Sequence, residues 1–160
     1  MGRFFLSLCM LMGAIAFSDA MAHRLPVATF TVAHVDDGEG RDPKATQVTV
    51  RIHGEDALKV LREMGAPALS LDDAAIVRLV GYASTRMEWG AEAIMVPLGG
   101  EVDGNWVYLY WEGEGHVTLT GASLLSDISK DWQNQVTIIS PGGERSSRAF
   151  HKGAKPPVHR

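Results

Sequence analysis

The chain has 160 residues and a formal net charge of −4, from 15 lysine and arginine residues against 19 aspartate and glutamate residues. This balance leaves no basic surplus, so we expect no nucleic-acid partner. The length suits a single domain with a core of its own, once the N-terminal segment described next is set aside.

The first 22 residues have the layout of a cleavable export signal. Arg3 supplies a positive charge, residues 4–17 form an apolar run, and Ala20-Met21-Ala22 provides the small side chains that a cleavage site requires. The apolar run is shorter than the roughly 20 residues that span a bilayer, so we expect cleavage rather than a retained anchor. We therefore predict a periplasmic or secreted protein with no stable membrane span after cleavage.

Cleavage after Ala22 would remove Cys9, the one cysteine of the chain. The mature protein could then form neither an internal disulfide nor a thiolate metal site. We expect residues 23–151 to fold as one domain that depends on its core alone. Residues 152–160 hold two prolines and several positive charges, and we expect them to be disordered.

Two alternating segments open the predicted domain. Residues 26–35 and 46–53 alternate between apolar and polar side chains, which indicates two half-buried strands. A polar, glycine-rich segment at 36–43 separates them, so we expect an antiparallel hairpin with one face in water. The predicted inward side chains are Ala28, Phe30, Val32, Val48, Val50 and Ile52, and His34 falls on the same side.

The hydrophobic period then becomes that of a helix. A first helix is predicted over 55–64, with Gly65 suited to its C-terminal cap. A second begins near Ser70, because Ser70 and Asp73 have the spacing of a capping box. The apolar faces of the two helices are predicted to be Ala57, Leu58, Leu61 and Met64 in the first, and Ala75, Ile76, Leu79, Val80 and Ala83 in the second.

From Met87 onward the pattern favours strands. The expected elements are a strand over 93–98 that turns at Gly99-Gly100, an aromatic strand over 106–111, an alternating stretch around Val117 and Leu119, a strand over 136–139 and a last strand over 145–151. Both sides of the aromatic strand are apolar or amphipathic, which predicts a central strand covered on both faces. The alternative is an aromatic platform for a glycan or a peptide.

About seven strands with a helical insertion after the second indicate a mainly β fold. We predict an antiparallel β-sandwich with one or two added helices, and a two-layer α+β sheet is the alternative. Neither architecture specifies a function.

The predicted cleavage site makes His23 the first candidate for chemistry. A free α-amine and the Nδ1 atom of one histidine can chelate a metal ion, and copper favours such nitrogen donors. His34, His53 and His116 lie on predicted strands and are candidates for a further ligand, with His53 and His116 pointing outward. The alternative is a solvated terminus that binds nothing, in which case we expect no cofactor.

Motifs of the common enzyme classes are absent from the sequence. It contains no H-E-x-x-H pair, no G-x-S-x-G elbow and no G-x-x-x-x-G-K-[ST] phosphate loop. Asp72-Asp73 is explained by a helix start, where negative charge is favourable. The amides of Gln133-Asn134-Gln135 are predicted to clamp the backbone of a neighbouring loop.

Several motifs follow one another along the mature chain: a histidine and a strand at its start, a strand running into an acidic helix start at 48–58, a Trp/Tyr-rich strand at 106–112, the pair Leu124-Leu125, a Gln/Asn-containing strand start at 131–136 and a final strand ending in phenylalanine at 146–150. This order resembles an uncharacterised family of secreted bacterial proteins, catalogued as a domain of unknown function. Members often carry a second histidine near the first, where this chain has Leu25-Pro26-Val27. The resemblance implies an exported β-rich domain and brings no activity with it.

Three functions remain open at this point. The first is an exported, non-enzymatic accessory or binding domain for a protein or a small ligand. The second is copper or other transition-metal handling through His23. The third is an enzyme whose site is assembled from residues far apart in the sequence.

Overall fold

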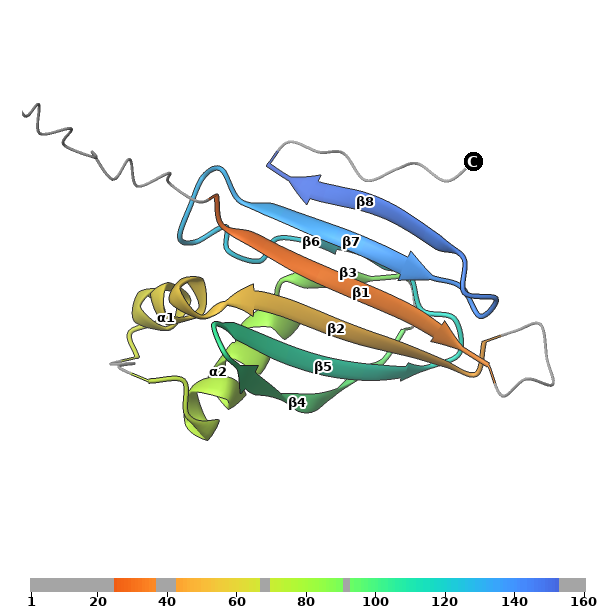
Figure 1. Ribbon diagram of the computed structural model, residues 1–160, viewed down its shortest axis with the longest axis horizontal. Helices are drawn as coiled ribbons and strands as arrows, with labels where there is room; N and C mark the ends of the chain where they lie inside the picture. The colour runs from red at the N-terminus through yellow and green to blue at the C-terminus, as the bar shows by residue number, and fades with distance from the viewer. Residues whose placement is uncertain (1–24, 37–42, 67–69, 91–92, 153–160) are drawn as a thin grey trace, which may run out of the picture.

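The computed structural model describes residues 25–36, 43–66, 70–90 and 93–152, which form the fold in Figure 1. These residues contain eight strands and two helices. The fold is therefore mainly β with a helical insertion, as predicted. The export signal over 1–22, His23 and residues 153–160 of the predicted tail lie outside the described residues.

The order of elements follows the predicted one closely. It is β1 (Val27–Val35), β2 (Ala45–His53), α1 (Gly54–Glu63), α2 (Asp73–Ser84), β3 (Met87–Trp89), β4 (Met95–Asp103), β5 (Trp106–Glu114), β6 (Leu119–Ala122), β7 (Gln133–Ile139) and β8 (Arg145–His151). The hairpin of β1 and β2 and the last strand, β8, were both expected from the alternation of side chains.

Six of the strands form one large sheet in the order β4-β5-β2-β1-β7-β8, and β3 pairs with β6 in a small second sheet. All pairs are antiparallel except β1 with β7, which is parallel. The expectation of a wholly antiparallel fold is wrong at this pair. Parallel neighbours need a long crossover connection, and the two helices and five strands between β1 and β7 supply it.

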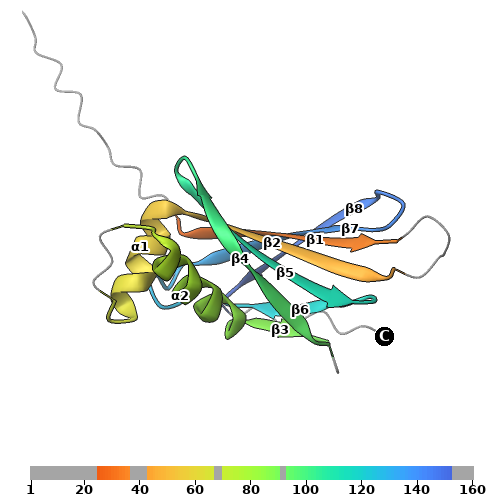
Figure 2. The ribbon, with the colours of Figure 1, turned by 90° about the horizontal axis from the view of Figure 1, so that it is seen from below.

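The two layers of the fold are unequal. Figure 2 shows α1, α2 and the small sheet on one face of the large sheet, while none of the described elements covers the other face. We call the uncovered side the open face. The second layer of the predicted sandwich thus consists of two helices and a two-stranded sheet.

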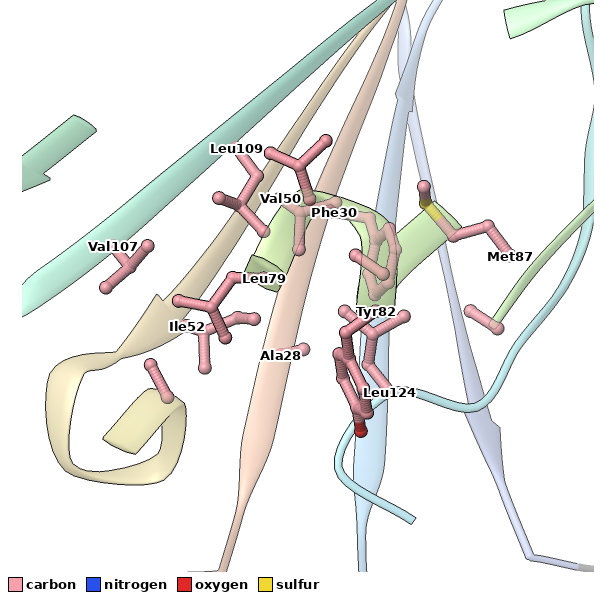
Figure 3. Packing of buried hydrophobic residues seen from close by; sticks show 14 of the residues in the cluster. Ala28, Phe30, Val50, Ile52, Leu79, Tyr82, Met87, Val107, Leu109 and Leu124 are labelled. Atoms are coloured by element: carbon pink, nitrogen blue, oxygen red, sulfur yellow. The ribbon is translucent and has the colours of Figure 1, made fainter. Parts of the chain in front are cut away.

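The hydrophobic core lies between these layers. Alternate residues of the central strands point into it, as the burial of every second residue in β1 and β2 shows. Figure 3 shows Phe30, Val50 and Leu109 from the large sheet facing Leu79 and Tyr82 of α2. All the inward residues predicted for the first hairpin are buried, and so is His34, at 7% exposure.

Both helix predictions need a local correction. In α1, Val60 is fully buried whereas Met64, at 47% exposure, lies outside the core. In α2 the N-terminal cap is Asp72, whose carboxylate accepts a hydrogen bond from the backbone N–H of Ala75 at 2.9 Å, and not Ser70. An aspartate placed directly before the helix serves this purpose as well as a serine does.

The expected turn at Gly99-Gly100 is also wrong. Strand β4 continues through both glycines with a bulge between Pro97 and Gly99, and the turn to β5 falls at Gly104, whose φ is 55°. A Cβ at Gly100 would lie 2.4 Å from the carbonyl oxygen of Tyr108 and 3.1 Å from Ile76 of α2. Glycine is required there for close packing and not for turning.

Strand β5 is covered on one side only. Val107, Leu109 and Trp111 are buried beneath the second layer, whereas Trp106, Tyr108 and Tyr110 are half-buried on the open face. The prediction that both sides are covered is therefore wrong. The open-face aromatic side chains contact their neighbours, since Arg51 lies 4.5 Å from the ring centre of Trp106 and Tyr110 donates a hydrogen bond to Glu101.

Candidate functional site

A pocket of about 330 Å³ opens at the end of the large sheet that lies farthest from α1. We call it the histidine pocket. Strands β1, β7 and β8 and the segment leading into β6 supply its lining residues, which are Val32, His34, His116, Val117, Thr118, Leu119, Ile138 and Arg148. Its volume falls at the lower end of the range of small-molecule sites.

Two imidazoles stack within this pocket. The ring centres of His34 and His116 are 4.0 Å apart and their planes differ by 22°. His34 is buried on the inner side of β1, and His116 is exposed beyond the end of β5. Burial lowers the pKa of His34 below its ordinary value of 6.5, and the neighbouring His116 lowers it further.

The hydroxyl of Thr46 holds His34 in place. It donates a hydrogen bond to the carbonyl oxygen of Gly115 at 2.7 Å and accepts one from the backbone N–H of Val117 at 2.9 Å. Nδ1 of His34 lies 3.0 Å from the hydroxyl oxygen of Thr46. Because the only hydroxyl proton goes to Gly115, Nδ1 must be the donor, which leaves the lone pair of the neutral ring on Nε2.

Arg148 brings a positive charge into the pocket without a counter-charge. Its guanidinium donates to the carbonyl oxygen of Leu119 and lies 5.0 Å from the ring centre of Phe150. Its Nε atom is buried and has no hydrogen-bond partner among the described residues. Burial lowers the pKa of Arg148, and the described residues lining the pocket include no carboxylate.

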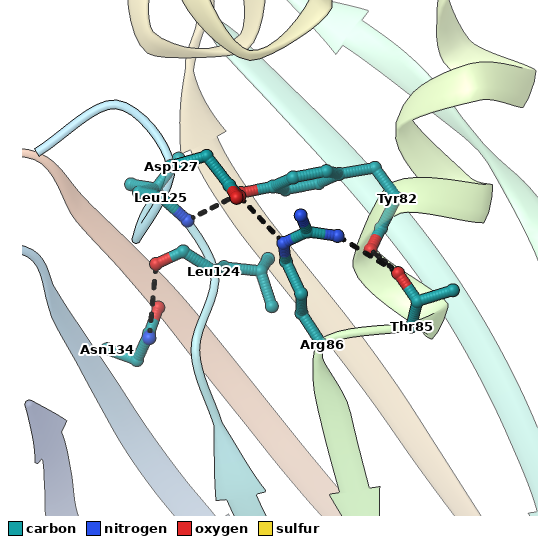
Figure 4. Close-up of polar contacts among 7 residues, drawn as sticks. All are labelled: Tyr82, Thr85, Arg86, Leu124, Leu125, Asp127 and Asn134. Atoms are coloured by element: carbon teal, nitrogen blue, oxygen red, sulfur yellow. Dashed lines mark hydrogen bonds and ion pairs between the residues drawn. The ribbon is translucent and has the colours of Figure 1, made fainter. Parts of the chain in front are cut away.

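A second polar group, which we call the tyrosine cluster, consists of Tyr82, Arg86 and Asp127. Tyr82 donates to the Asp127 carboxylate at 3.0 Å and accepts from the backbone N–H of Leu125 at 2.9 Å, while Nε of Arg86 donates to the same carboxylate at 2.8 Å (Figure 4). Burial raises the pKa of Tyr82, and the bond from Arg86 lowers the pKa of Asp127. The cluster joins the end of α2 to the loop after β6, where Leu125 adopts a φ of 68°.

A larger hollow of about 740 Å³ runs beside the edge strand β4. Ile94, Val96 and Leu98 line it with exposed apolar side chains. Lys44 contributes a positive charge to its lining, and Glu112 and Glu114 contribute two negative charges. Compared with the histidine pocket, it offers a ligand few directional contacts.

The structure separates the histidines that the sequence suggested as metal ligands. His53 caps α1, because its Nδ1 accepts the backbone N–H of Glu55 at 3.3 Å, and it pairs with Trp106 at the start of β5. His116 follows the other end of β5. At about 3.3 Å per residue, the two ends of this strand lie roughly 26 Å apart. Among the described residues no group of three or more histidine, cysteine or acidic side chains could hold a metal ion.

The copper hypothesis stays a prediction, because His23 lies outside the described residues. Strand β1 begins at Val27, at the end of the large sheet where β2 finishes with His53. His34 and His116 lie at the opposite end.

The sequence predicted the placement of two of the buried polar side chains, His34 and Asn134, and gave no prediction for two others. It placed His34 inward, and it predicted the clamp at Asn134, which is confirmed because this amide donates to the carbonyl oxygens of Ala122 and Leu124 at 3.1 and 3.3 Å. It missed Thr46 and Arg148. The alternation of β8 carries a signal for Arg148, since the buried Phe150 lies two residues further on the same strand and so shares its side.

No protein-family model matches the chain, and no curated protein matches it significantly. The resemblance to a family of secreted bacterial proteins therefore stays a prediction. Neither helix in the part of the chain that the structure describes is long and apolar enough to cross a bilayer.

Proposed function

We propose that the protein is an exported, non-enzymatic domain that binds a small ligand in the histidine pocket. The observation that carries this proposal is the convergence of His34, His116 and Arg148 on one pocket from three separate parts of the chain. The rest of the core between the layers consists mainly of apolar side chains. Polar side chains gathered in a pocket with apolar walls are typical of ligand sites.

The hydrogen bonds of Thr46 favour binding over catalysis. A hydroxyl activated as a nucleophile donates its proton to a basic imidazole. Here the direction is reversed, since Thr46 donates to Gly115 and receives a hydrogen bond from His34. Thr46 therefore positions the two histidines and the loop between Gly115 and Val117, and it does not take part in a nucleophile–base pair.

Export is the second part of the proposal, and it rests on the signal at residues 1–22. Expression of the full chain in a bacterial host tests it directly. We expect a periplasmic product whose mass corresponds to a chain that starts at His23. A cytoplasmic product that keeps residues 1–22 would contradict export, and a different start would remove the basis for copper binding through His23.

A pocket-filling variant tests ligand binding. Thr118→Trp places a large ring in the histidine pocket, and Thr31→Trp adds the same ring at an exposed position on the open face. Each protein is dialysed against a small-molecule extract of the host periplasm, and retained compounds are identified by mass spectrometry. We expect wild type and Thr31→Trp to retain a compound that Thr118→Trp loses. Equal retention by all three proteins, or none by wild type, would overturn the proposal.

A further inference from the structure

We infer that the ligand of the histidine pocket is a small oxyanion, carrying a carboxylate or phosphate group, that pairs with Arg148 and His116. This inference rests on the proposed function, because it assigns a chemical class to the ligand of the same pocket. Four features of the pocket support it.

The first feature is the charge of Arg148. Arg148 is half-buried, and burial of part of a guanidinium costs free energy unless an anion and hydrogen-bond acceptors compensate it. The protein supplies one backbone carbonyl, from Leu119, and leaves Nε without an acceptor. An oxyanion provides both the missing charge and the missing acceptors, in a geometry that arginine binds well.

The second feature is the pair of stacked imidazoles. Nδ1 of His34 is committed to Thr46, and His116 lies over the ring with its own side chain exposed. Two protonated rings in contact repel each other, which is why His116 lowers the pKa of His34. A bound anion opposes this repulsion, whereas a bound cation would add to it.

The third feature is the set of groups around the two rings. Strand β1 contributes His34 with Val32, β7 contributes Ile138, β8 contributes Arg148, and the segment before β6 contributes His116 together with Val117, Thr118 and Leu119. The ionisable groups of the described lining are thus all basic. The apolar walls lower the local dielectric constant and strengthen an ion pair formed there, and Thr118 offers a hydroxyl donor.

The fourth feature argues against a metal cation as the ligand. Stacked parallel rings direct their nitrogen atoms along separate planes, whereas ligands of one ion must converge on it. The guanidinium of Arg148 also repels a divalent cation. The same groups that make the pocket unsuitable for copper therefore make it suitable for an oxyanion.

The experiment compares two arginines of the same strand. Arg148→Gln removes the charge inside the pocket, and Arg145→Gln removes an equal charge from an exposed position three residues away on β8. Binding of inorganic phosphate and of succinate is measured by titration calorimetry, with chloride as a control for ionic strength. We expect wild type and Arg145→Gln to bind at least one of the two anions, and Arg148→Gln to bind it at least about tenfold more weakly.

The two anions distinguish a phosphate from a carboxylate ligand. His116→Gln should weaken binding of the same anion, because it removes a ring that pairs with the ligand in the proposed complex. Since His116 is exposed, this variant tests the inference even if Arg148→Gln fails to fold.

Three results would overturn the inference. They are equal affinity of Arg148→Gln and wild type, no binding of either anion, and competition of the anions by copper(II) at the pocket. If Thr118→Trp nevertheless loses a compound that wild type retains, and that compound is neutral or cationic, the proposed function stands and the oxyanion inference fails. If no compound is retained and no anion binds, both fail.

Discussion

The tyrosine cluster and the histidine pocket each contain an arginine, but only the arginine of the tyrosine cluster is paired with a carboxylate among the described residues. In the tyrosine cluster the hydroxyl of Tyr82 both donates and accepts, and the charge of Arg86 meets that of Asp127 at 2.8 Å. In the histidine pocket the charge of Arg148 meets no carboxylate of the described lining, and its Nε has no partner.

This difference separates a structural role from a binding role. Buried polar groups in folded proteins are nearly always hydrogen-bonded, so a cluster that satisfies itself needs nothing further. A buried group left unsatisfied lowers stability. Among the described residues three side-chain atoms are in this position, Nε of Arg51, Oδ1 of Asn134 and Nε of Arg148, and of these three residues only Arg148 lines the histidine pocket. The tyrosine cluster holds α2 against the loop after β6, whereas we propose that a ligand completes the histidine pocket.

The largest loss of stability is expected at Thr46, whose hydroxyl bonds both to His34 in the histidine pocket and to the backbone of the adjacent loop. Thr46→Val keeps the shape of the side chain and removes three hydrogen bonds, leaving the backbone groups of Gly115 and Val117 without their partner. We expect a loss of about 3 kcal/mol in the free energy of unfolding, measured with urea. Thr49→Val on the open face should change it by less than about 0.5 kcal/mol. A cost below about 1 kcal/mol for Thr46→Val would show that the network is not needed.

Removal of the Tyr82 hydroxyl is the next test. Tyr82→Phe keeps the ring in the core and deprives the buried N–H of Leu125 of its acceptor. We expect a loss of about 2 kcal/mol in the same measurement. Tyr108→Phe, on the open face, is the matched control and should cost less than about 0.5 kcal/mol. Equal costs for the two variants would remove the structural role assigned to the cluster.

The two arginines provide the sharpest contrast between the regions. Arg86→Met breaks the ion pair with Asp127 and should cost about 1 kcal/mol, a value limited by the partial exposure of both groups. Arg148→Met loses one hydrogen bond but also removes an uncompensated charge, so we expect a change of less than about 0.5 kcal/mol in anion-free buffer. If Arg148→Met proves the more costly of the two, Arg148 has a structural role and the contrast fails.

The smallest expected effect is the dependence of stability on pH at His34. Its pKa is lowered in the folded state, chiefly by burial, so below its ordinary value of 6.5 the unfolded chain binds more protons at this position than the folded one. Stability is therefore lost as the pH falls below about 6.5. Wild type should lose more stability than His34→Gln between about pH 7 and about pH 5, as measured by urea unfolding. Parallel pH profiles would contradict this assignment.

Most of the secondary structure was predictable, because periodicity is a local property. Alternation along 26–35 and 46–53 follows from the pleat of a strand with one buried side, and it indicated the inward position of His34 as well. The errors arose where distant packing overrode a local signal. Gly99-Gly100 has the composition of a turn, but the approach of Tyr108 and Ile76 to Gly100 places these glycines inside a strand.

The amino-acid sequence alone therefore determined most of the strands, both helices and the inward side of the first hairpin, since these depend on neighbours a few residues away. It did not determine the short strand β3 or the open side of β5. The tertiary structure was required for the parallel pairing of β1 with β7 and for the meeting of His34, His116 and Arg148. These residues come together through pairing between strands far apart in the chain. Such pairing is set by how the whole core packs, and no local pattern of residues records it.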